Sequence, residues 1–287
     1  MNSLLRGAFT RPRQPAAFRR TSGYTPSTGI IGVILQHRRF YAPPGSVKGR
    51  AITLDEGESH HLSRVLRMNE GDRVFVFDGV GKEYECRVSR IARGSAELEI
   101  IKDAVSTAES PLSLTLAQAM AKTDKFDFIV QKATELGVHG IIPLVTDHAD
   151  VKLDDARAGE RRERWRRISL ESLKQCGRST LVEITLPARI DSLLDLKPIG
   201  SGRLFIAFTE SGGAPLVEAT GGTMSASAIT LMVGPEGGWS EREIELMTRH
   251  NVIRATLGPR VLRTETAAVA AVTLLQHLHG DLSVPRR

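Results

Sequence analysis

The sequence predicts an α/β protein in which a small β-rich unit precedes a larger domain built on a mostly parallel sheet. In residues 38–107, several short alternating segments accompany one helical segment, a pattern typical of a small barrel. After Pro111, strand candidates alternate with amphipathic helix candidates, which favours a parallel α/β sheet. Near the C-terminus, two Gly-Pro loops each follow an apolar run and precede a helical pattern.

Residues 1–37 differ in composition from the rest of the chain. They contain five arginines and no lysine, and the first acidic residue of the chain is Asp55. Because the formal net charge is +6, the remaining chain carries only +1, so its basic character alone does not indicate nucleic-acid binding. An acid-free segment rich in Arg, Ser, Thr and Pro is typical of a transit peptide. We therefore expect a mitochondrial matrix protein; a disordered basic tail on a cytoplasmic protein is the alternative.

The unit at residues 38–107 has alternating apolar and polar positions, as half-buried strands do. Asp78-Gly79 and Arg93-Gly94-Ser95 are turn signals between its strands. The pattern predicts strands over residues 74–77, 84–91 and 96–101 and one short helix over residues 60–66.

The second domain, placed at residues 110–284, alternates strands and helices throughout. Its strands are expected over residues 113–118, 140–145, 203–209, 229–233 and 254–257. Its helices are expected over residues 124–136, 160–176, 240–249 and 264–279. Ser240 and Glu243 have the spacing of a capping box. Residues 211–227, rich in Ser, Gly, Ala and Thr, are expected to form a surface connection.

The two Gly-Pro loops are Gly234-Pro235-Glu236-Gly237-Gly238 and Gly258-Pro259-Arg260. Glycine has no Cβ and accepts positive φ, so such loops bring bare backbone close to a ligand. Neither a dinucleotide fingerprint nor a Walker A loop is present, which disfavours a nucleotide phosphate. The only cysteines, Cys86 and Cys176, are far apart, and no apolar run approaches the roughly 20 residues of a membrane span. A metal site and a membrane partner are therefore not expected.

Arg263 directly precedes the last helix, where a cation opposes the helix dipole. We therefore expect it to pair with an acid or a ligand, and Glu236 is the nearest candidate. Thr264 or Thr266 is expected to cap that helix. The basic residues elsewhere have two interpretations, phosphate contacts or an ordinary solvated face, and the sequence leaves both open. They are Arg64, Arg67, Lys122, Lys125 and Lys132.

Several segments, taken in order, resemble the RsmE-type 16S ribosomal RNA (uracil-N3)-methyltransferases of the SPOUT class. The resemblance covers about residues 38–280 and is most specific in its last two segments. The segments are Arg38–Tyr41, His60–Arg67, Lys132–Val138, Ile142–Leu144, Arg164–Ile168, Gln175–Arg178, Gly234–Gly238 and Leu257–Ala267.

The resemblance implies a PUA-like N-terminal barrel that holds RNA and a C-terminal trefoil-knotted domain that binds S-adenosylmethionine (SAM). It also implies a homodimer and methylation of N3 of a uridine in small-subunit ribosomal RNA. Two alternatives remain from the sequence. One is a non-catalytic ribosome-assembly factor that binds RNA, and the other is a SPOUT methyltransferase acting at another RNA position.

On this resemblance, three polar residues are expected to be catalytic: Arg178, Glu236 and Arg263. The expected SAM site comprises Thr209, Val233, Gly234, Gly238, Leu257, Gly258, Leu262, Thr264 and Glu265. The five basic residues named above are expected to contact RNA.

The chain departs from the family at two places. Asp147-His148-Ala149-Asp150 stands where an Arg-Ser pair is usual, and Gln175-Cys176 replaces Gln-Ser. We expect these departures to alter contacts with RNA more than the binding of SAM.

Overall fold

The computed structural model describes residues 38–149, 155–195, 202–220 and 227–283. The expected transit segment at residues 1–37 lies outside the described residues, as does part of the expected connection at residues 211–227. None of the helices in the described ranges is both long and apolar enough to cross a membrane.

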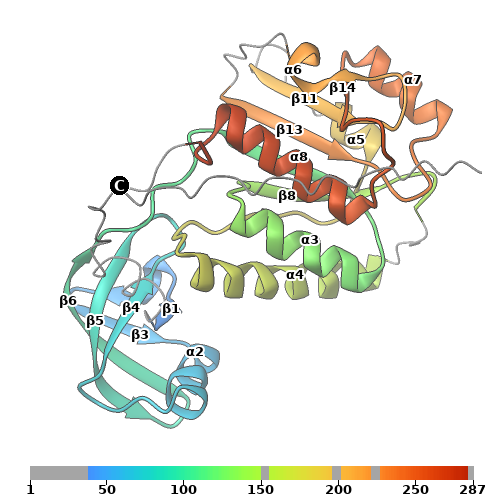
Figure 1. Ribbon diagram of the computed structural model, residues 1–287. Coiled ribbons are helices and arrows are strands. Elements are labelled where there is room, and N and C mark those ends of the chain that lie inside the picture. Colours follow the sequence, from blue (N-terminus) through green and yellow to red (C-terminus); the bar gives the residue numbers. More distant parts are fainter. Residues whose placement is uncertain (1–37, 150–154, 196–201, 221–226, 284–287) are drawn as a thin grey trace, which may run out of the picture. The chain divides into compact units, whose positions relative to one another are not determined.

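The N-terminal domain is one curled, six-stranded sheet with the order β1-β4-β5-β6-β3-β2 (Figure 1). β1 pairs with β4 in parallel, and the remaining neighbours are antiparallel. Register shifts in the long β5–β6 pair bend the sheet, as β-bulges do. Its strands are β1 (Arg39–Tyr41), β2 (Val47–Lys48), β3 (Ala51–Leu54), β4 (Arg73–Phe77), β5 (Glu83–Ala92) and β6 (Ser95–Ala104).

The three strands predicted for this domain are confirmed as β4, β5 and β6. Alternate residues in parts of these strands, such as Val74, Val76 and Leu98, are buried in a common core. For the helix predicted over residues 60–66, the predicted first residue lies too late in the chain. The helix starts as α2 (Glu56–His60), because the Asp55 carboxylate accepts a hydrogen bond from the Glu58 backbone N–H, and it continues as the π-helix η2 (His61–Val65).

The C-terminal domain has an eight-stranded sheet in which every pairing is parallel. Its order is β10-β8-β7-β13-β11-β14-β12, and β9 pairs with β8. The five predicted strands are confirmed as β7 (Ser113–Ala119), β8 (Gly140–Val145), β11 (Arg203–Phe208), β13 (Ala228–Val233) and β14 (Ile253–Thr256). Three strands of two residues, too short to show a period, were not predicted: β9 (Glu183–Ile184), β10 (Ala188–Arg189) and β12 (Ala214–Pro215).

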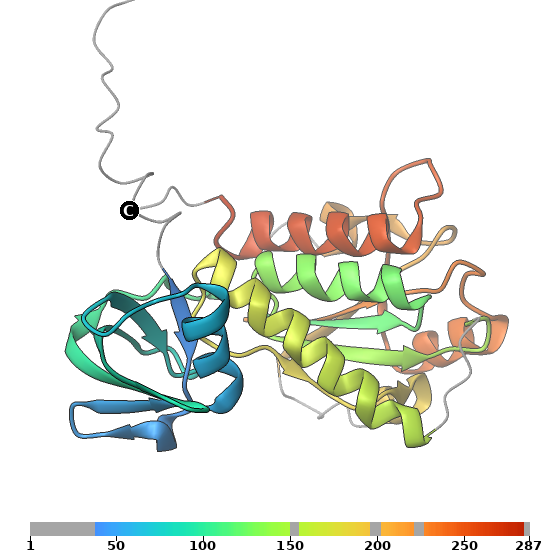
Figure 2. The same ribbon diagram turned by 90° about the horizontal axis from the view of Figure 1, so that it is seen from below.

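Helices cover both faces of this sheet, as Figures 1 and 2 show. α3 and α8 cover one face, α5 and α7 the other, and α4 packs against α3. Consecutive strand residues therefore enter different cores: Leu231 packs with the α3 and α8 side, and Met232 with the α5 and α7 side. The helices are α3 (Thr123–Glu135), α4 (Asp155–Cys176), α5 (Ile190–Asp195), α6 (Leu216–Ala219), α7 (Glu241–Arg249) and α8 (Thr264–His279).

The last helix returns across the sheet. β14 lies beyond β11, whereas α8, which follows it in the chain, packs against β13 and β7. This return is what the trefoil-knotted topology implied by the resemblance requires. The predicted fold class, a parallel α/β domain with a small curled β domain before it, is therefore confirmed.

Candidate functional site

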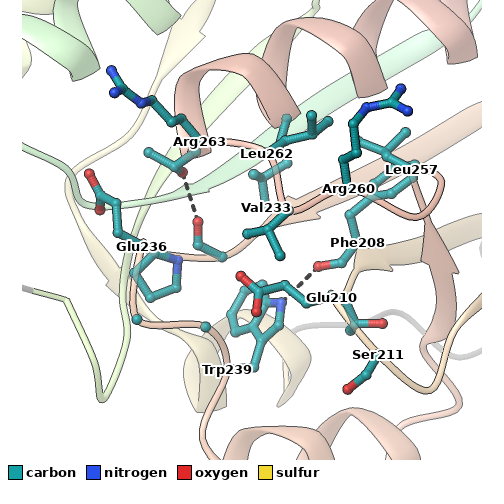
Figure 3. Close-up of a pocket in the computed structure, with 18 of the residues that line it drawn as sticks. Phe208, Glu210, Ser211, Val233, Glu236, Trp239, Leu257, Arg260, Leu262 and Arg263 are labelled. Carbon is teal, nitrogen blue, oxygen red and sulfur yellow. Dashed lines mark hydrogen bonds between the residues drawn. The ribbon is translucent and has the colours of Figure 1, made fainter.

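A cavity of about 610 Å³ opens at the carboxyl ends of β11, β13 and β14 (Figure 3). Three loops line it, at residues 208–212, 233–239 and 257–264. In open α/β sheets, ligands bind outside the carboxyl ends of the strands. We call residues 234–239 the GPEGG loop, after the first of the two Gly-Pro motifs.

Side chains and backbone tie the three loops together. The Trp239 Nε1–H donates to the Phe208 carbonyl at 2.9 Å, and the Thr209 N–H donates to the Ala255 carbonyl at 2.9 Å. The indole also lies against Gly234, where an added Cβ would come within 3.0 Å of it. The Trp239 ring occupies the space that a side chain at position 234 would need, which explains why this residue is glycine.

Thr264 connects the GPEGG loop to α8 from the buried side. Its Oγ1 donates to the Gly234 carbonyl at 2.8 Å and accepts from Gln118 Nε2 at 2.9 Å. The expected capping by Thr264 or Thr266 is wrong. The N-cap is Arg263, without a side-chain cap, because the Thr264 hydroxyl is already committed to Gly234.

Glu236 and Arg263 both line the cavity, on the same side of it in Figure 3, but the expected ion pair between them is not formed. Lys125 Nζ instead lies 2.6 Å from Glu236 Oε1 and 3.8 Å from Glu265 Oε2. Burial alone would raise the pKa of Glu236, but the hydrogen bond and charge of Lys125 hold that pKa below its usual value. Glu236 is therefore a carboxylate kept ionised by a lysine from α3.

The structure brings most of the expected SAM site together. The members that line the cavity are Thr209, Val233, Gly234, Gly238, Leu257, Gly258, Leu262 and Thr264. Glu265 is not in the wall, and its nearest charged partner is Lys125. At Gly238 and Gly258, φ is +71° and +84°, and an added Cβ would meet no atom within 4 Å. At these two positions the backbone faces open space, with no side chain in between.

Some cavity residues were missed by the sequence analysis. Glu210, Ser211 and Gly212 lie in the wall, although residues from 211 onward were expected to be a surface connection. Their position directly after a predicted strand, at the same sheet edge as the two Gly-Pro loops, was the available signal. Arg254 and Arg260 also line the cavity, so its wall contains both basic and acidic side chains.

Thr209 supplies an unused polar group in the wall. Its Oγ1 is buried and has no hydrogen-bond partner among the described residues. Buried polar atoms are nearly always satisfied, by ligand or water where the protein offers nothing. The bare backbone at Gly238 and Gly258 leaves room for a flat or extended ligand.

Arg178 is not brought to the cavity. It is 6% exposed, and its guanidinium donates to Glu109 Oε2 at 2.6 and 2.9 Å and to the carbonyls of Thr134 and Val138 at 2.7 and 3.1 Å. The side chain holds the end of α3 and the loop that follows it to the segment before β7. Its expected catalytic role stays a prediction.

The five basic residues expected to contact RNA fall into two groups. Lys125 pairs with Glu236, and Lys132 pairs with Glu135 on its own helix at 2.9 Å. Lys122, Arg64 and Arg67 are exposed and have no ion pair within the described part of the chain. In the same part of the chain, no cluster of three or more His, Cys, Asp or Glu residues has the arrangement of a metal site.

Comparison with known families matches both domains. Residues 108–276 match the model of an RNA methyltransferase domain, and residues 54–101 match that of an RNA methyltransferase PUA domain. The ribosomal RNA small subunit methyltransferase E of Bacillus subtilis (strain 168) is 32% identical over 248 residues, covering 84% of this chain and 94% of the relative. The protein of the same name from Aquifex aeolicus is 32% identical over 231 residues, covering 80% and 96%.

Two solved structures are also similar over most of their length. The Neisseria gonorrhoeae ribosomal RNA small subunit methyltransferase E, bound to S-adenosyl methionine, has 34% identity and a TM-score of 0.77, covering 86% of this chain and 99% of that one. A putative methyltransferase from Legionella pneumophila, in complex with SAM, has 32% identity and a TM-score of 0.79, covering 86% and 100%. The chain therefore belongs to the ribosomal RNA small subunit methyltransferase E family.

Proposed function

We propose that this protein uses SAM to methylate N3 of a uridine in small-subunit ribosomal RNA. The observation that carries the proposal is the cavity formed by three loops at the carboxyl ends of β11, β13 and β14. It has a main-chain border and an unused Thr209 hydroxyl, and it lies in a chain whose gonococcal relative binds SAM.

The residues that would hold SAM are those of the three loops that line the cavity. They include Thr209, Gly234, Leu257, Gly258 and Leu262. When bound, SAM supplies a methyl group made electrophilic by its sulfonium. The surrounding loops contribute by fixing the direction from which a base can approach, since methyl transfer requires an in-line geometry.

The proton on N3 of uracil must leave for that nitrogen to attack. We assign its acceptor to Glu236, a carboxylate in the cavity wall whose pKa Lys125 holds below its usual value. Arg263, at the cavity and without an ion pair among the described residues, would stabilise the negative charge that spreads to the uracil carbonyl oxygens.

A Lys125→Met variant is expected to shift the pH dependence of methylation. Lys125 lowers the pKa of Glu236, so the wild-type carboxylate stays ionised to a lower pH. Without the lysine, burial is less opposed and that pKa rises. The acidic limb of the kcat/KM profile should then move to higher pH, and the deficit should shrink as the pH increases.

The matched control is Lys132→Met, on the same helix but paired with Glu135 away from the cavity. The acidic limb of its profile should lie at the same pH as in the wild type. A Lys125→Met profile with an unshifted acidic limb would show that Glu236 does not set the pH dependence.

We also propose that the protein is a homodimer that uses the outer face of α3 and α8. Phe128 on α3 and Leu274 and Leu278 on α8 are 44%, 39% and 43% exposed, and the two helices are neighbours.

A double variant with Leu274→Glu and Leu278→Glu should sediment as a monomer. A Val105→Glu variant, at a 99% exposed position outside both helices, should keep the wild-type mass. A wild-type monomer would contradict the proposal.

The proposed location is the mitochondrial matrix, on the composition of residues 1–37. A reporter fused to these residues should accumulate in mitochondria, and a reporter carrying the same segment with its five arginines replaced by glutamine should not. Cytosolic accumulation of the first reporter would reject this location.

The reaction is tested by mass spectrometry of small-subunit rRNA nucleosides from a deletion strain. Loss of 3-methyluridine, restored by the wild-type gene, is the expected result, and an unchanged level would reject the substrate. Calorimetry with purified protein separates the enzyme from a non-catalytic RNA-binding scaffold, because only the enzyme needs to bind SAM.

A further inference from the structure

The segment that follows β8, where the sequence departs from its family, is fixed onto the start of α7. The Asp147 carboxylate accepts hydrogen bonds from Arg242 Nε and Nη2, both at 3.0 Å, and from Ser240 Oγ at 2.7 Å. The Asp147 N–H donates to Glu243 Oε1 at 3.0 Å, and Glu243 is fully buried. Its position is therefore determined by contacts through both side chain and backbone.

The next residue, His148, reaches the GPEGG loop. Its Nδ1 lies 3.1 Å from the Gly237 carbonyl and 3.2 Å from the Gly238 carbonyl. Carbonyl oxygens only accept hydrogen bonds, so Nδ1 must carry the proton and donate to them. In the neutral ring, Nε2 is then the unprotonated nitrogen.

The contact requires a residue without a side chain at position 237. A Cβ at that position would lie 3.0 Å from the His148 Cβ and 3.4 Å from its carbonyl oxygen. The absence of a side chain there is what lets the imidazole approach the loop. Gly237 and Gly238 themselves line the cavity, whereas His148 does not. His148 therefore contacts the loop that forms the wall of the proposed SAM site from outside the cavity.

Histidine and the arginine usual in this region of the family share one chemical property, the donation of hydrogen bonds. They differ in basicity, because arginine stays protonated and cannot take up a proton at neutral pH. We infer that His148 is a positioning residue that holds the Gly237–Gly238 backbone for the cofactor through its Nδ1–H. The inference rests on the proposed use of SAM and assigns the departure from the family pattern to the SAM site rather than to RNA.

The test compares three variants by calorimetry with SAM and by steady-state kinetics. His148→Phe removes the donor and keeps a ring. His148→Asn keeps a donor close to the position of Nδ1. His139→Phe is the matched control, an exposed histidine at the opposite end of β8. His148 is exposed, and the loss of one such hydrogen bond in His148→Phe is expected to raise the Kd for SAM about fivefold.

The expected pattern separates positioning from chemistry. His148→Phe should raise Kd and the KM for SAM while kcat at saturating SAM stays near wild type, and His148→Asn should restore most of the affinity. An unchanged Kd in His148→Phe overturns the inference. So does a loss of kcat at saturating SAM shared by His148→Phe and His148→Asn, which would indicate a direct role of Nε2.

A measurement that needs no ligand completes the test. Nitrogen NMR of the wild type at a pH where the ring is neutral should show the Nδ1–H tautomer of His148. Observation of the Nε2–H tautomer would overturn the inference. If the wild type binds no SAM, the proposed function fails, whereas wild-type binding with unaffected variants rejects only the role of His148.

Discussion

Replacement of Arg178 by alanine is expected to destabilise the protein strongly. The side chain makes four hydrogen bonds to Glu109 and to the carbonyls of Thr134 and Val138 while being only 6% exposed. Removing this arginine is expected to cost about 3 kcal/mol, because the two buried carbonyls and the partly exposed Glu109 carboxylate lose their partners. In a domain of this size that corresponds to a fall in Tm of roughly 10 °C, measurable by calorimetry.

The control is Arg166→Ala, on the outer surface of α4. Arg166 is 48% exposed and pairs with Glu163 at 3.0 Å, and exposed pairs of this kind contribute about 0–1 kcal/mol. Its Tm should stay close to that of the wild type. An Arg178→Ala protein that is as stable as the wild type but inactive would instead support the catalytic role that the sequence suggests.

Arg178 also shows what a sequence pattern can and cannot reveal. The pattern located the end of α4 correctly at Cys176, because helix periodicity and the following glycine are local signals. The partner of Arg178, Glu109, lies 69 residues away. Such a pairing depends on how elements pack, and no spacing rule in one sequence encodes it.

The same reason explains the misassigned partner of Glu236. Glu236 and Arg263 both line the cavity, because their loops follow the carboxyl ends of β13 and β14, the two parallel strands that flank β11. The cation that reaches Glu236 comes from α3, 111 residues earlier in the chain. Sheet topology predicts which loops meet, but the side chains that pair across them depend on helix placement.

Strands and glycine loops were predictable because their signals are local. β8, β11 and β13 are mostly apolar runs of six residues, and the capping box at Ser240 is formed as its spacing predicts. Ser211 and Gly212 belong to the segment 211–227, for which the Ser, Gly, Ala and Thr content predicts a surface connection. Composition reports solvent contact but does not distinguish a free surface from the wall of a cavity.

Thr264→Val is expected to weaken both folding stability and SAM binding. Valine keeps the branched shape of threonine but removes the hydroxyl that bonds the Gly234 carbonyl and Gln118. Two polar groups near the base of the cavity then lose a partner, at a cost of about 1–3 kcal/mol. Urea unfolding should show the lower stability.

Thr266→Val, in the same helical turn but exposed, is the control and should change neither quantity. The Thr264 bond links the backbone of the GPEGG loop to α8, the helix that returns across the sheet after β14. If the two glycine loops form one site, loosening this link must raise the Kd for SAM as well as lower stability. A Thr264→Val protein with reduced stability and unchanged affinity would mean that the GPEGG loop keeps its shape without α8, and that the return of the chain serves folding alone.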